Sequence, residues 1–583
     1  MPTLNWIGKE KVVTHHLDVP YRVLERKYTF GDTPDSGNMI IHGDNLEALK
    51  ALLPQYEGKI KCIYIDPPYN TGNEGWVYND NVNDPHIRKW LGRVVGSEMD
   101  DLTRHDKWLC MMYPRLKLLY NLLAPDGVIF ISIDENEFES LKIICDEIWS
   151  RSNYVGMLTW ESTTQPTNAG KARFNLQKKV EPILMYRKSA LRSTYLLEEL
   201  ESKCNYPHIG RFGACRFEII EKSDAGGYNR ETMKFPILGM LPREGKRWQI
   251  GEDTAKDLEK EGKVEIVNGI VKRAIYPEDE IDKRKFRPFW SHFDAKTYGT
   301  AQSGKELLNT IMGRDTGFDT IKPPELIAEL ISHLPKDSIV LDCFAGSGTT
   351  AHAVLLQNSK DGGNRRFILV EKMDYVESIA AERIRRVITG YNFESEIEEE
   401  VFSERITIKN ITNSTSLLER VKESIAEKRK QYNKIGKPVI EDSCIKVFGT
   451  KKNENSFVGL GGSFDFYELG EAIFDSATGL LNDNVDTEQI RRYVWFTETN
   501  SPYIKPGKDS HPYFLGSFQH SNYYFYYNKD KETCLDPSFL KTFTLKDMAE
   551  MYIIYADRCV LTEEKMVELN IRFKKIPRDI KRV

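Results

Sequence analysis

The tetrad Asp66-Pro67-Pro68-Tyr69 is the group of residues whose types and spacing most clearly suggest chemistry. It follows the apolar run 60–65, which has the pattern of a buried strand. The aspartate carboxylate and a proline carbonyl on a stiff turn offer two acceptors to one amine, and the tyrosine offers a face to a flat ring. This arrangement suits a nucleobase that has been flipped out of its stack. A plain surface turn is the alternative, but it fits poorly directly after an apolar strand.

A second group, residues 342–350, reads Asp-Cys-Phe-Ala-Gly-Ser-Gly-Thr-Thr between an expected strand and an expected helix. Its small residues let the backbone approach a ligand closely. No lysine follows Gly348, which argues against a phosphate-cradling loop, and the third glycine of the dinucleotide fingerprint is missing. Glu371, which ends the next expected strand, is placed to hold ribose hydroxyls. A plain tight turn and an ordinary strand-end carboxylate are the alternative interpretations.

Length and composition describe an ordinary globular chain. A chain of 583 residues is too long for a single hydrophobic core, so we predict three or four domains. The formal net charge of −5 gives no global attraction to nucleic acid, so any basic surface must be local. The nine cysteines form no CxxC pair, which argues against a metal site and a disulfide framework. Without a signal-peptide pattern or a long apolar run, we expect a soluble, cytoplasmic protein with no membrane segment.

The remaining pattern indicates alternating α/β structure in two blocks. Apolar runs at 39–42, 60–65 and 128–133 alternate with helical patterns at 105–123 and 137–149, and a second block has strands at 338–343 and 367–370 and helices at 349–357 and 375–388. These blocks share one sheet or form two. Residues from about 190 to 300 have mixed charge, many glycines and no sustained helical period, which indicates an inserted domain. Beyond 391 we expect an acidic linker, a charged helix at 417–432 and aromatic strands at 523–527 and 551–555.

The expected insert contains basic residues interleaved with aromatic ones. Such mixtures suit phosphate contact and base stacking, although a charged run is often only a solvated face. Their position between the two α/β blocks favours DNA contact. The candidates are Arg243, Lys246, Arg247 and Trp248, and then Lys283, Arg284, Lys285, Phe286, Arg287, Phe289 and Trp290.

Together, the tetrad and the loop resemble the amino-group DNA methyltransferases that use S-adenosyl-L-methionine. In that family an aspartate-first tetrad implies N6 of adenine, and a serine-first tetrad implies N4 of cytosine. The tetrad lies upstream of the loop with the insert between them, an order similar to the beta class. The implied fold class is α/β: a Rossmann-like methyltransferase sheet with a circularly permuted motif order, an inserted target-recognition domain and an α+β carboxyl-terminal domain.

A narrower resemblance is to the modification subunit of type III restriction systems, carried by residues 42–49, 66–72, 108–137, 318–323 and 461–470. It covers nearly the whole chain outside the insert. It implies double-stranded DNA as the substrate, a homodimer and a separate helicase and nuclease restriction subunit. The implied domains are an amino-terminal segment (1–38), an upstream core segment with the tetrad (39–189), the recognition insert (190–300), a downstream core segment with the loop (301–392) and a dimerisation or partner domain (393–583).

The resemblance also assigns roles to residues. Asp66 and the Pro67 carbonyl would accept hydrogen bonds from the adenine amino group, and Tyr69 would stack on the base, with Pro68 completing the tetrad. Asp44 could equally cap the helix that follows it, and Lys322 could be a solvated charge before a helix. The implied cofactor-binding residues are Asp44, Lys322, Pro323, Asp342, Phe344, Ala345, Gly346, Ser347, Gly348, Thr349 and Glu371.

Three other functions are compatible with these motifs. One is a stand-alone DNA methyltransferase acting on adenine N6 or cytosine N4. Another is a methyltransferase of RNA or of a protein amide, against which the long insert with its basic clusters argues. The third is a non-catalytic DNA-binding subunit, which the two intact motifs disfavour. The sequence shows no nuclease or helicase motif, so cleavage of DNA would require a partner.

Overall fold

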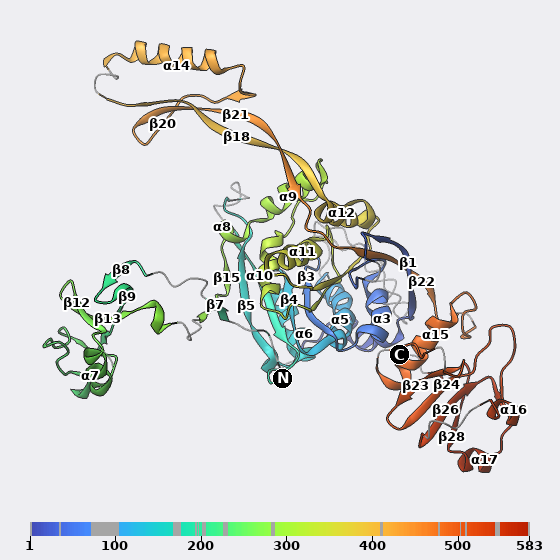
Figure 1. Cartoon of the computed structure of the whole chain (residues 1–583). Helices are drawn as coiled ribbons and strands as arrows, with labels where there is room; N and C mark the ends of the chain where they lie inside the picture. The colour runs from blue at the N-terminus through green and yellow to red at the C-terminus, as the bar shows by residue number, and fades with distance from the viewer. Residues whose placement is uncertain are drawn as a thin grey trace. The chain divides into compact units, whose positions relative to one another are not determined.

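The computed structural model describes residues 3–33, 36–70, 104–166, 176–192, 195, 198–200, 206–224, 231–280, 286–407, 412–475, 478–501, 503–507, 510–542 and 549–580. The chain forms two compact units (Figure 1): Met1–Tyr195 with Ser291–Val583, and Leu196–Trp290. The second unit falls within the insert expected at 190–300. No helix in the described ranges has the length and apolar character needed to cross a membrane.

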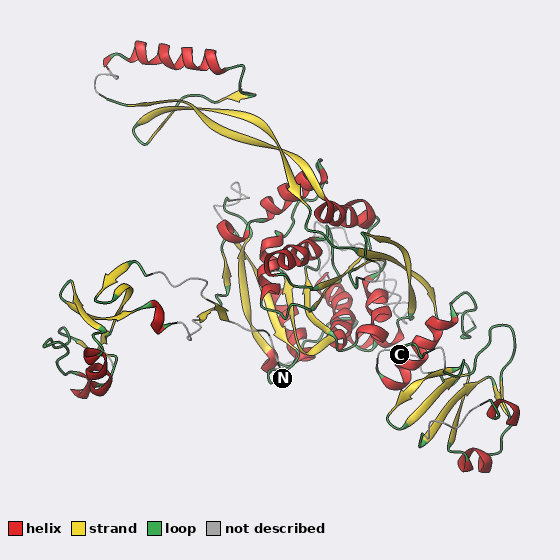
Figure 2. Cartoon of the chain, in the orientation of Figure 1, coloured by secondary structure: helices red, strands yellow, loops and turns green. Residues whose placement is uncertain are grey.

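The first unit is built on one ten-stranded sheet (Figure 2). Its six neighbouring strands from β22 to β4 run parallel, while β1 and β6 flank them in antiparallel orientation. In sheet order the strands are β1 (Arg22–Phe30), β22 (Phe464–Ala472), β2 (Met39–His42), β17 (Arg366–Glu371), β16 (Ile339–Asp342), β3 (Ile60–Ile65), β4 (Leu123–Ser132), β6 (Val180–Arg187), β5 (Tyr154–Glu161) and β15 (His292–Phe293).

The two α/β blocks of the sequence share this sheet. Strand β16 of the second block pairs with β3 of the first, with Val340 opposite Cys62 and Leu341 opposite Ile63. These strands are buried along nearly their whole length, as expected for parallel strands covered on both faces. Pairing of β16 with β3 therefore brings the residue that follows β3 close to the residues that follow β16.

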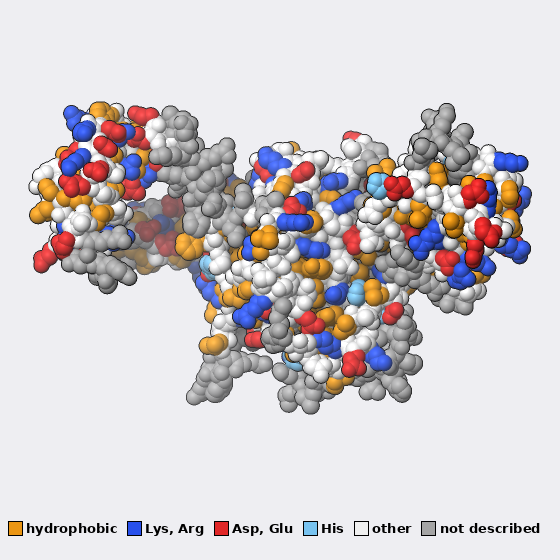
Figure 3. Space-filling view, turned by 90° about the horizontal axis from the view of Figure 1, so that it is seen from below, with side chains coloured by type: hydrophobic (Ala, Val, Ile, Leu, Met, Phe, Trp, Pro, Cys, Tyr) orange, Lys and Arg blue, Asp and Glu red, His pale blue; other side chains and the backbone are white. Residues whose placement is uncertain are grey.

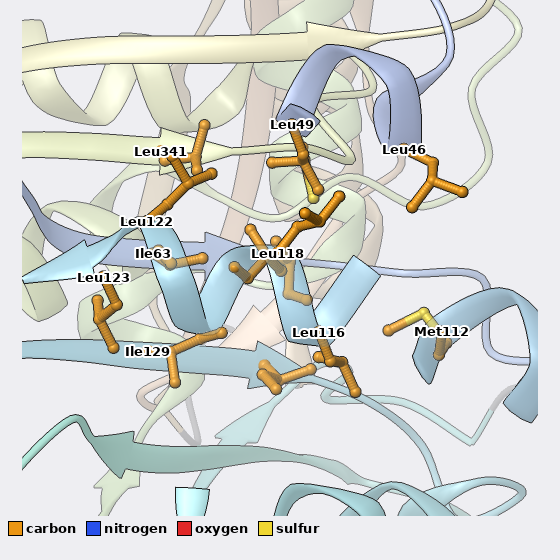
Figure 4. Packing of buried hydrophobic residues seen from close by; sticks show 14 of the residues in the cluster. Leu46, Leu49, Ile63, Met112, Leu116, Leu118, Leu122, Leu123, Ile129 and Leu341 are labelled. Carbon is orange, nitrogen blue, oxygen red and sulfur yellow. The ribbon is translucent and has the colours of Figure 1, made fainter. Parts of the chain in front are cut away.

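Helices cover both faces of the sheet. On one face, α3 (Asn45–Tyr56), α5 (Arg104–Leu122) and α6 (Phe138–Trp149) share a core with Ile63, Ile129 and Leu341. Figure 4 shows Leu118 of α5 among the side chains of this core. On the other face, Tyr195 contacts the ring of Phe130 and donates a hydrogen bond to a carbonyl of α10 (Pro324–Ser332), which packs against α11 (Thr349–Asp361). Each fully buried leucine in such a core contributes about 2 kcal/mol.

Two expected domain boundaries are placed differently by the structure. Strand β22 belongs to the expected carboxyl-terminal domain (393–583), yet it pairs with β2 inside the central sheet. Strand β1 belongs to the expected amino-terminal segment (1–38), yet it pairs with β22. Phe464 and Phe466 are buried there, so β22 is part of the core and the boundary at 393 does not separate two folding units.

The expected acidic linker after residue 391 is a strand instead. Strands β18 (Gly390–Arg405) and β21 (Cys444–Val458) form a long antiparallel ribbon, and the segment between them carries α14 (Ser414–Lys428), β19 (Lys434–Ile435) and β20 (Val439–Glu441). We call residues 390–458 the ribbon arm. Two glutamates of β18 pair with lysines of β21 across the ribbon: Lys452 contacts Glu394 at 2.6 Å, and Lys451 pairs with Glu399. Cross-strand pairing of this kind stabilises a sequence whose charge alone resembles a linker.

The carboxyl-terminal region has its own four-stranded sheet in the order β23 (Phe514–Phe518), β24 (Ser521–Phe525), β26 (Met551–Ala556) and β28 (Ile571–Lys575). Helix α15 (Thr487–Thr499) packs against it through Tyr493 and Trp495. The remaining described elements of the first unit are α1 (Lys9–Val12), α2 (His15–Asp18), η1 (Arg151–Asn153), α8 (Ala295–Tyr298), α9 (Ala301–Met312), η4 (Val376–Ala381), α12 (Glu382–Thr389), β25 (Cys534–Leu535), α16 (Pro537–Leu540), β27 (Arg558–Cys559) and α17 (Glu563–Glu568).

The second unit contains a small antiparallel sheet in the order β12 (Val264–Val267), β13 (Ile270–Ile275), β9 (Gly213–Ile219) and β8 (His208–Gly210). Helix α7 (Glu252–Lys260) contributes Ala255 and Leu258 to a core centred on Trp248. Its other strands are β7 (Glu198–Leu200), β10 (Glu221–Ser223), β11 (Lys246–Trp248) and β14 (Phe286–Pro288).

Candidate active site

The tetrad and the glycine-containing loop meet at one edge of the sheet. Asp66 directly follows β3, and Asp342 is the last residue of the neighbouring strand β16. The carboxyl ends of adjacent parallel strands lie at the same edge, where α/β proteins bind ligands. A cavity of about 110 Å³ opens there, lined by Tyr64, Asp66, Phe318, Thr320, Ile321, Lys322, Ile327, Asp342, Phe344, Ala345, Gly346, Ser347, Thr349 and Thr350.

Lys322 contacts the tetrad directly. Its Nζ donates to Oδ1 and Oδ2 of Asp66 at 3.0 and 2.9 Å and to the Tyr69 hydroxyl oxygen at 2.7 Å. The Lys322 side chain is 9% exposed, which excludes the interpretation of a solvated charge. Burial disfavours its charge, but Asp66 and Glu181 outweigh this and raise the pKa of Lys322 above its ordinary value. Lys322 therefore lines the cavity as an ammonium group bound to the tetrad.

The two proline carbonyls of the tetrad have different environments. The indole Nε1 of Trp108, on α5, donates to the Pro68 carbonyl at 2.7 Å. Among the described residues, no backbone N–H donates to the carbonyl of Pro67. The Trp108 bond fixes the turn, and the Pro67 carbonyl is the one that the sequence interpretation assigns to an incoming amine.

The residue after the tetrad is held in a conformation that needs support. Asn70 has φ 61°, in the left-handed region where Asn is among the few tolerated side chains. Its amide Nδ2 donates to Glu137, and the same carboxylate oxygen lies 2.6 Å from Nδ1 of His105. Glu137 is fully buried, so this contact anchors the end of the tetrad beneath the surface. Thr71, which extends the motif, lies outside the described residues.

Asp342 organises the start of the loop. Its carboxylate accepts hydrogen bonds from the Phe344 amide at 3.0 Å and from the Thr350 hydroxyl at 2.5 Å. Burial raises the pKa of Asp342 to about 7, and the negative charge of nearby Asp66 acts in the same direction. The two strand-end carboxyl groups are therefore close enough to influence each other's charge. Gly346 and Gly348 have φ 53° and 80°, in the left-handed region that favours glycine over other residues at both positions.

Arg383, which the sequence pattern did not reveal as a site residue, supports the far end of the loop. It is fully buried, and its Nη1 donates to the Ser347 hydroxyl at 3.0 Å and to the Thr349 hydroxyl at 2.8 Å. Burial lowers the pKa of Arg383 to about 10, so it remains charged at neutral pH. One feature of the sequence could have revealed the burial of Arg383. It lies four residues from both Ile379 and Val387, on a helical face where an apolar residue is expected.

Glu371 binds the loop backbone. Its Oε2 accepts from the Gly346 amide at 2.8 Å, and its Oε1 accepts from the amides of Lys372 and Met373 at 2.9 and 3.0 Å. Burial raises the pKa of Glu371 above its ordinary value. Glu371 is the last residue of β17, as predicted, and the bonds from the backbone amides orient its carboxylate beside the loop.

Asp44 caps helix α3 and takes part in a charged cluster. Its side chain accepts from the Leu46 amide at 2.9 Å and pairs with Lys372 at 2.9 Å and Arg115 at 3.5 Å. Although burial opposes ionisation, Arg115 and Lys372 hold the pKa of Asp44 below its ordinary value. The helix-cap interpretation therefore holds for this residue. Of the residues predicted to bind the cofactor, Asp44, Pro323, Gly348 and Glu371 do not line the cavity.

The described residues among those predicted to bind DNA do not come together at a shared cavity as the tetrad and the loop do. Trp248 is fully buried and its indole donates to the Phe235 carbonyl, so it is not available to stack on a base and that assignment is wrong. Arg243 pairs with Glu221 at 2.7 Å, and Arg247 lies 3.5 Å from Asp224. Lys283, Arg284 and Lys285 lie outside the described residues, and Arg287 is described only as a backbone position in β14.

Charged side chains of both signs lie on the surface of the protein (Figure 3). On the face of the protein seen in Figure 3, cationic and anionic side chains are interspersed. Of the predicted basic residues, Arg243 and Arg247 are partly neutralised by carboxylates of their own unit. Lys246, in β11 between them, is half-buried.

Comparisons with known proteins agree with the geometry of the first unit. A family model described as DNA methylase matches residues 60–382, which include the tetrad, the insert and the glycine-containing loop. The chain belongs to this DNA methylase family. The match spans both α/β blocks, so the family includes the sheet edge where Asp66 and Asp342 meet.

The similarity of this DNA methylase to curated relatives covers more of the chain than residues 60–382. The Mod subunit of the type III restriction-modification enzyme StyLTI from Salmonella typhimurium is 33% identical over 395 residues, 62% of this chain and 58% of the relative. The type II methyltransferase M.KpnI from Klebsiella pneumoniae is 32% identical over 58% of this chain and 81% of that protein. The aligned region thus spans about three fifths of the Mod subunits it matches.

Among solved structures, the PvuII DNA methyltransferase (cytosine-N4-specific) matches with a TM-score of 0.31 and 13% identity. This match covers 61% of the DNA methylase chain and 89% of the PvuII chain. A TM-score of this size carries no weight for the function.

Proposed function

We propose that this DNA methylase transfers a methyl group from S-adenosyl-L-methionine to N6 of an adenine flipped out of double-stranded DNA. The observation that carries the proposal is the cavity shared by Asp66 of the tetrad and by Asp342 and Phe344 of the loop. A target amine at Asp66 and a methyl donor at the loop would meet within it. An aspartate-first tetrad favours adenine over cytosine.

The residues of the tetrad orient the amine. An aromatic amine is a poor nucleophile because its lone pair is delocalised into the ring. The Asp66 carboxylate and the Pro67 carbonyl, as two acceptors, favour a pyramidal nitrogen and aim its lone pair along one direction. Tyr69 supplies the ring face against which a flipped base stacks. Positioning and electrostatics account for the rate, and no covalent intermediate with the protein is required.

The loop residues fit the cofactor. S-adenosyl-L-methionine, when bound, supplies an electrophilic methyl group on a sulfonium. Its amino group and ribose hydroxyls need carboxylate partners, a role we assign to Asp342 and Glu371, and its apolar parts need a surface, which we assign to Phe344. The left-handed Gly346, which lines the cavity, keeps the turn free of a side chain where a ligand would approach the backbone. Gly348 ends the same turn and faces Ala380. Lys322, Ala345, Ser347 and Thr349 also line the cavity. Asp44 and Pro323 complete the proposed set on the resemblance alone.

The biological context we infer is the modification subunit of a type III restriction-modification system, with the permuted motif order of the beta class. Similarity to three Mod subunits at 30 to 33% identity supports it. The second unit, at 196–290, would recognise the DNA sequence. A helicase and nuclease subunit would be the partner that cleaves unmodified DNA.

A stand-alone methyltransferase is the second candidate. It is favoured by one observation, the coverage of 81% of the type II methyltransferase M.KpnI at 32% identity. Purification of the chain from its native host through an affinity tag separates the two, because a type III subunit brings down a stoichiometric large partner and a stand-alone enzyme does not.

The ribbon arm and the carboxyl-terminal sheet are the proposed sites of dimer and partner contacts. The register offers a clean excision of the arm, because Ser395 lies directly opposite Asn453. Replacing residues 396–452 with Asn-Gly leaves a short hairpin and retains β22 in the central sheet. A monomer by light scattering, with methyl transfer lost, supports a dimer built by the arm. An unchanged dimer removes the arm from the proposal.

The main proposal is tested with purified protein, labelled S-adenosyl-L-methionine and duplex DNA of mixed sequence. Digestion of the product to nucleosides should place the label on N6-methyladenine. Label on cytosine, or label found only when RNA or protein is supplied, would show that adenine in DNA is not the substrate.

A further inference from the structure

Glu181 belongs to neither motif, yet it reaches the tetrad from the antiparallel strand β6. Its Oε2 accepts a hydrogen bond from the Tyr69 hydroxyl at 3.1 Å and lies 3.4 Å from Nζ of Lys322. The side chains of Glu181 and Lys322 are 15% and 9% exposed, so water screens their interaction weakly. The ammonium of Lys322 thus lies between two carboxylates, those of Asp66 and Glu181.

This ammonium is placed unfavourably for a reaction at Asp66. It binds both oxygens of the carboxylate that the target amine needs as an acceptor. The amine nitrogen also gains positive charge as it bonds to the methyl carbon and the carbon–sulfur bond breaks, until it loses a proton to Asp66 or solvent. An ammonium on the same carboxylate weakens that acceptor and repels the developing charge.

We propose that Glu181 is a positioning residue that draws the ammonium of Lys322 toward itself when the target amine binds Asp66. This inference rests on the proposed amine methylation. A shift of about 0.5 Å would bring Nζ within charge-assisted hydrogen-bond distance of Glu181. The contacts of Nζ with Asp66 lengthen by no more than the same amount, so the ammonium is shared more evenly between the two carboxylates. It stays neutralised in a buried site, where an unpaired charge would be costly.

The aromatic walls permit this small movement and oppose a larger one. Nζ of Lys322 lies 5.0 Å from the ring centroid of Tyr69 and 5.3 Å from that of Trp160, within the range of cation–π attraction. Trp160 is almost fully buried, and its indole donates to the Gly299 carbonyl at 2.9 Å, so this wall is fixed. The ammonium therefore moves toward Glu181 without leaving the space between the two rings.

A double-mutant cycle tests whether Glu181 acts through Lys322. Single-turnover methyl transfer and KM for DNA are measured for the wild type, Glu181→Gln, Lys322→Met and the double variant. We expect Glu181→Gln to lower the single-turnover rate by about 10- to 100-fold, since removal of a buried charge partner is strongly felt, with KM nearly unchanged. In the Lys322→Met background, the same substitution should change the rate less than about twofold, because no ammonium remains to relocate.

Three controls separate positioning from folding. Glu181→Asp should recover some of the rate. Binding of S-adenosylhomocysteine should be nearly unchanged in Glu181→Gln, since Glu181 contacts Tyr69 and the ammonium of Lys322 and not the loop at 342–350. Glu161→Gln, on the adjacent strand β5 and paired with Lys179 at 2.8 Å, should leave the rate unchanged as a matched ion-pair control.

The outcomes are distinguishable. Equal rate losses from Glu181→Gln in both backgrounds would overturn this inference and leave the proposed function intact. Wild-type protein that methylates no DNA under any condition would overturn the proposed function and the inference together.

Discussion

The active-site edge of the first unit and the insert at 196–290 use polar residues in opposite ways. At the sheet edge, Asp66, Lys322 and Asp342 come from distant regions of the chain and line one cavity. In the insert, Arg243 and Arg247 pair with nearby acids, and Trp248 forms the core. Parallel strand ends force convergence, whereas a mixture of basic and aromatic residues does not determine which side chains face solvent. Polar residues at strand ends are therefore stronger evidence of a site than composition is.

The largest expected effect comes from Asp66→Ala. Removing the carboxylate that orients the amine should lower methyl transfer by about 10³-fold, the magnitude typical of a lost transition-state hydrogen-bond partner. Binding of S-adenosylhomocysteine, measured by calorimetry, should persist because the loop is intact. Asp66→Asn, which keeps one acceptor oxygen, serves as the milder variant. Loss of cofactor binding in Asp66→Ala would show that Asp66 belongs to the cofactor site.

Trp248→Ala should destabilise the second unit by about 3–5 kcal/mol, as is typical of removing a large aromatic residue from a core. Limited proteolysis within 196–290 should become faster, while fragments of the first unit stay resistant. Trp290→Ala is the matched control, since this tryptophan is 76% exposed and contributes little to packing. If Trp248→Ala kept the unit resistant but lost DNA binding, the comparison between the two regions would fail.

The charge of Asp342 predicts a pH dependence of stability. Its pKa is about 7 in the folded protein and near 3.8 when unfolded, so between these values the folded state holds a proton that the unfolded state releases. This group therefore favours the folded state at low pH, and its contribution is lost as the pH rises through about 7. Asp342→Asn removes the effect, so the fall in melting temperature from pH 5 to pH 8 should shrink by a few degrees. An identical fall in both proteins would mean that Asp342 ionises normally.

The smallest effect concerns the insert surface. If Lys246 contacts a phosphate, Lys246→Ala should reduce the slope of log affinity for DNA against log salt by about 1, without altering sequence preference. Lys256→Ala, on α7 and paired with Glu252 at 2.8 Å, is the control and should leave the slope unchanged. Equal slopes for the two variants would remove Lys246 from the DNA interface.

Strong local signals in the sequence predicted much of the fold. The apolar runs at 39–42 and 60–65 are strands β2 and β3, and the expected helix at 105–123 is α5 within one residue at each end. Strand β22 was not assigned to the sheet, because pairing with β2 is a long-range contact that no local pattern encodes. The same limit hid Glu181 and Arg383, whose roles depend on which neighbours tertiary packing brings to them.

The positions of the site residues were easier to predict than their contacts. The tetrad and the loop follow adjacent strands, so their proximity comes from the topology alone. The direction of the Lys322 side chain, toward Asp66 and Tyr69, depends on burial between two aromatic rings and two carboxylates. The basic residues of the insert lacked such topological constraint, and Trp248 was misassigned for that reason.

The most direct test of the central claim is methylation-sensitive sequencing of DNA from cells that express this chain alone, beside cells that express Asp66→Ala. We predict one recurring sequence with a modified adenine in the wild-type culture and no modification of that sequence in the variant culture. A modified cytosine, or the same modification in both cultures, would contradict the proposed adenine methylation.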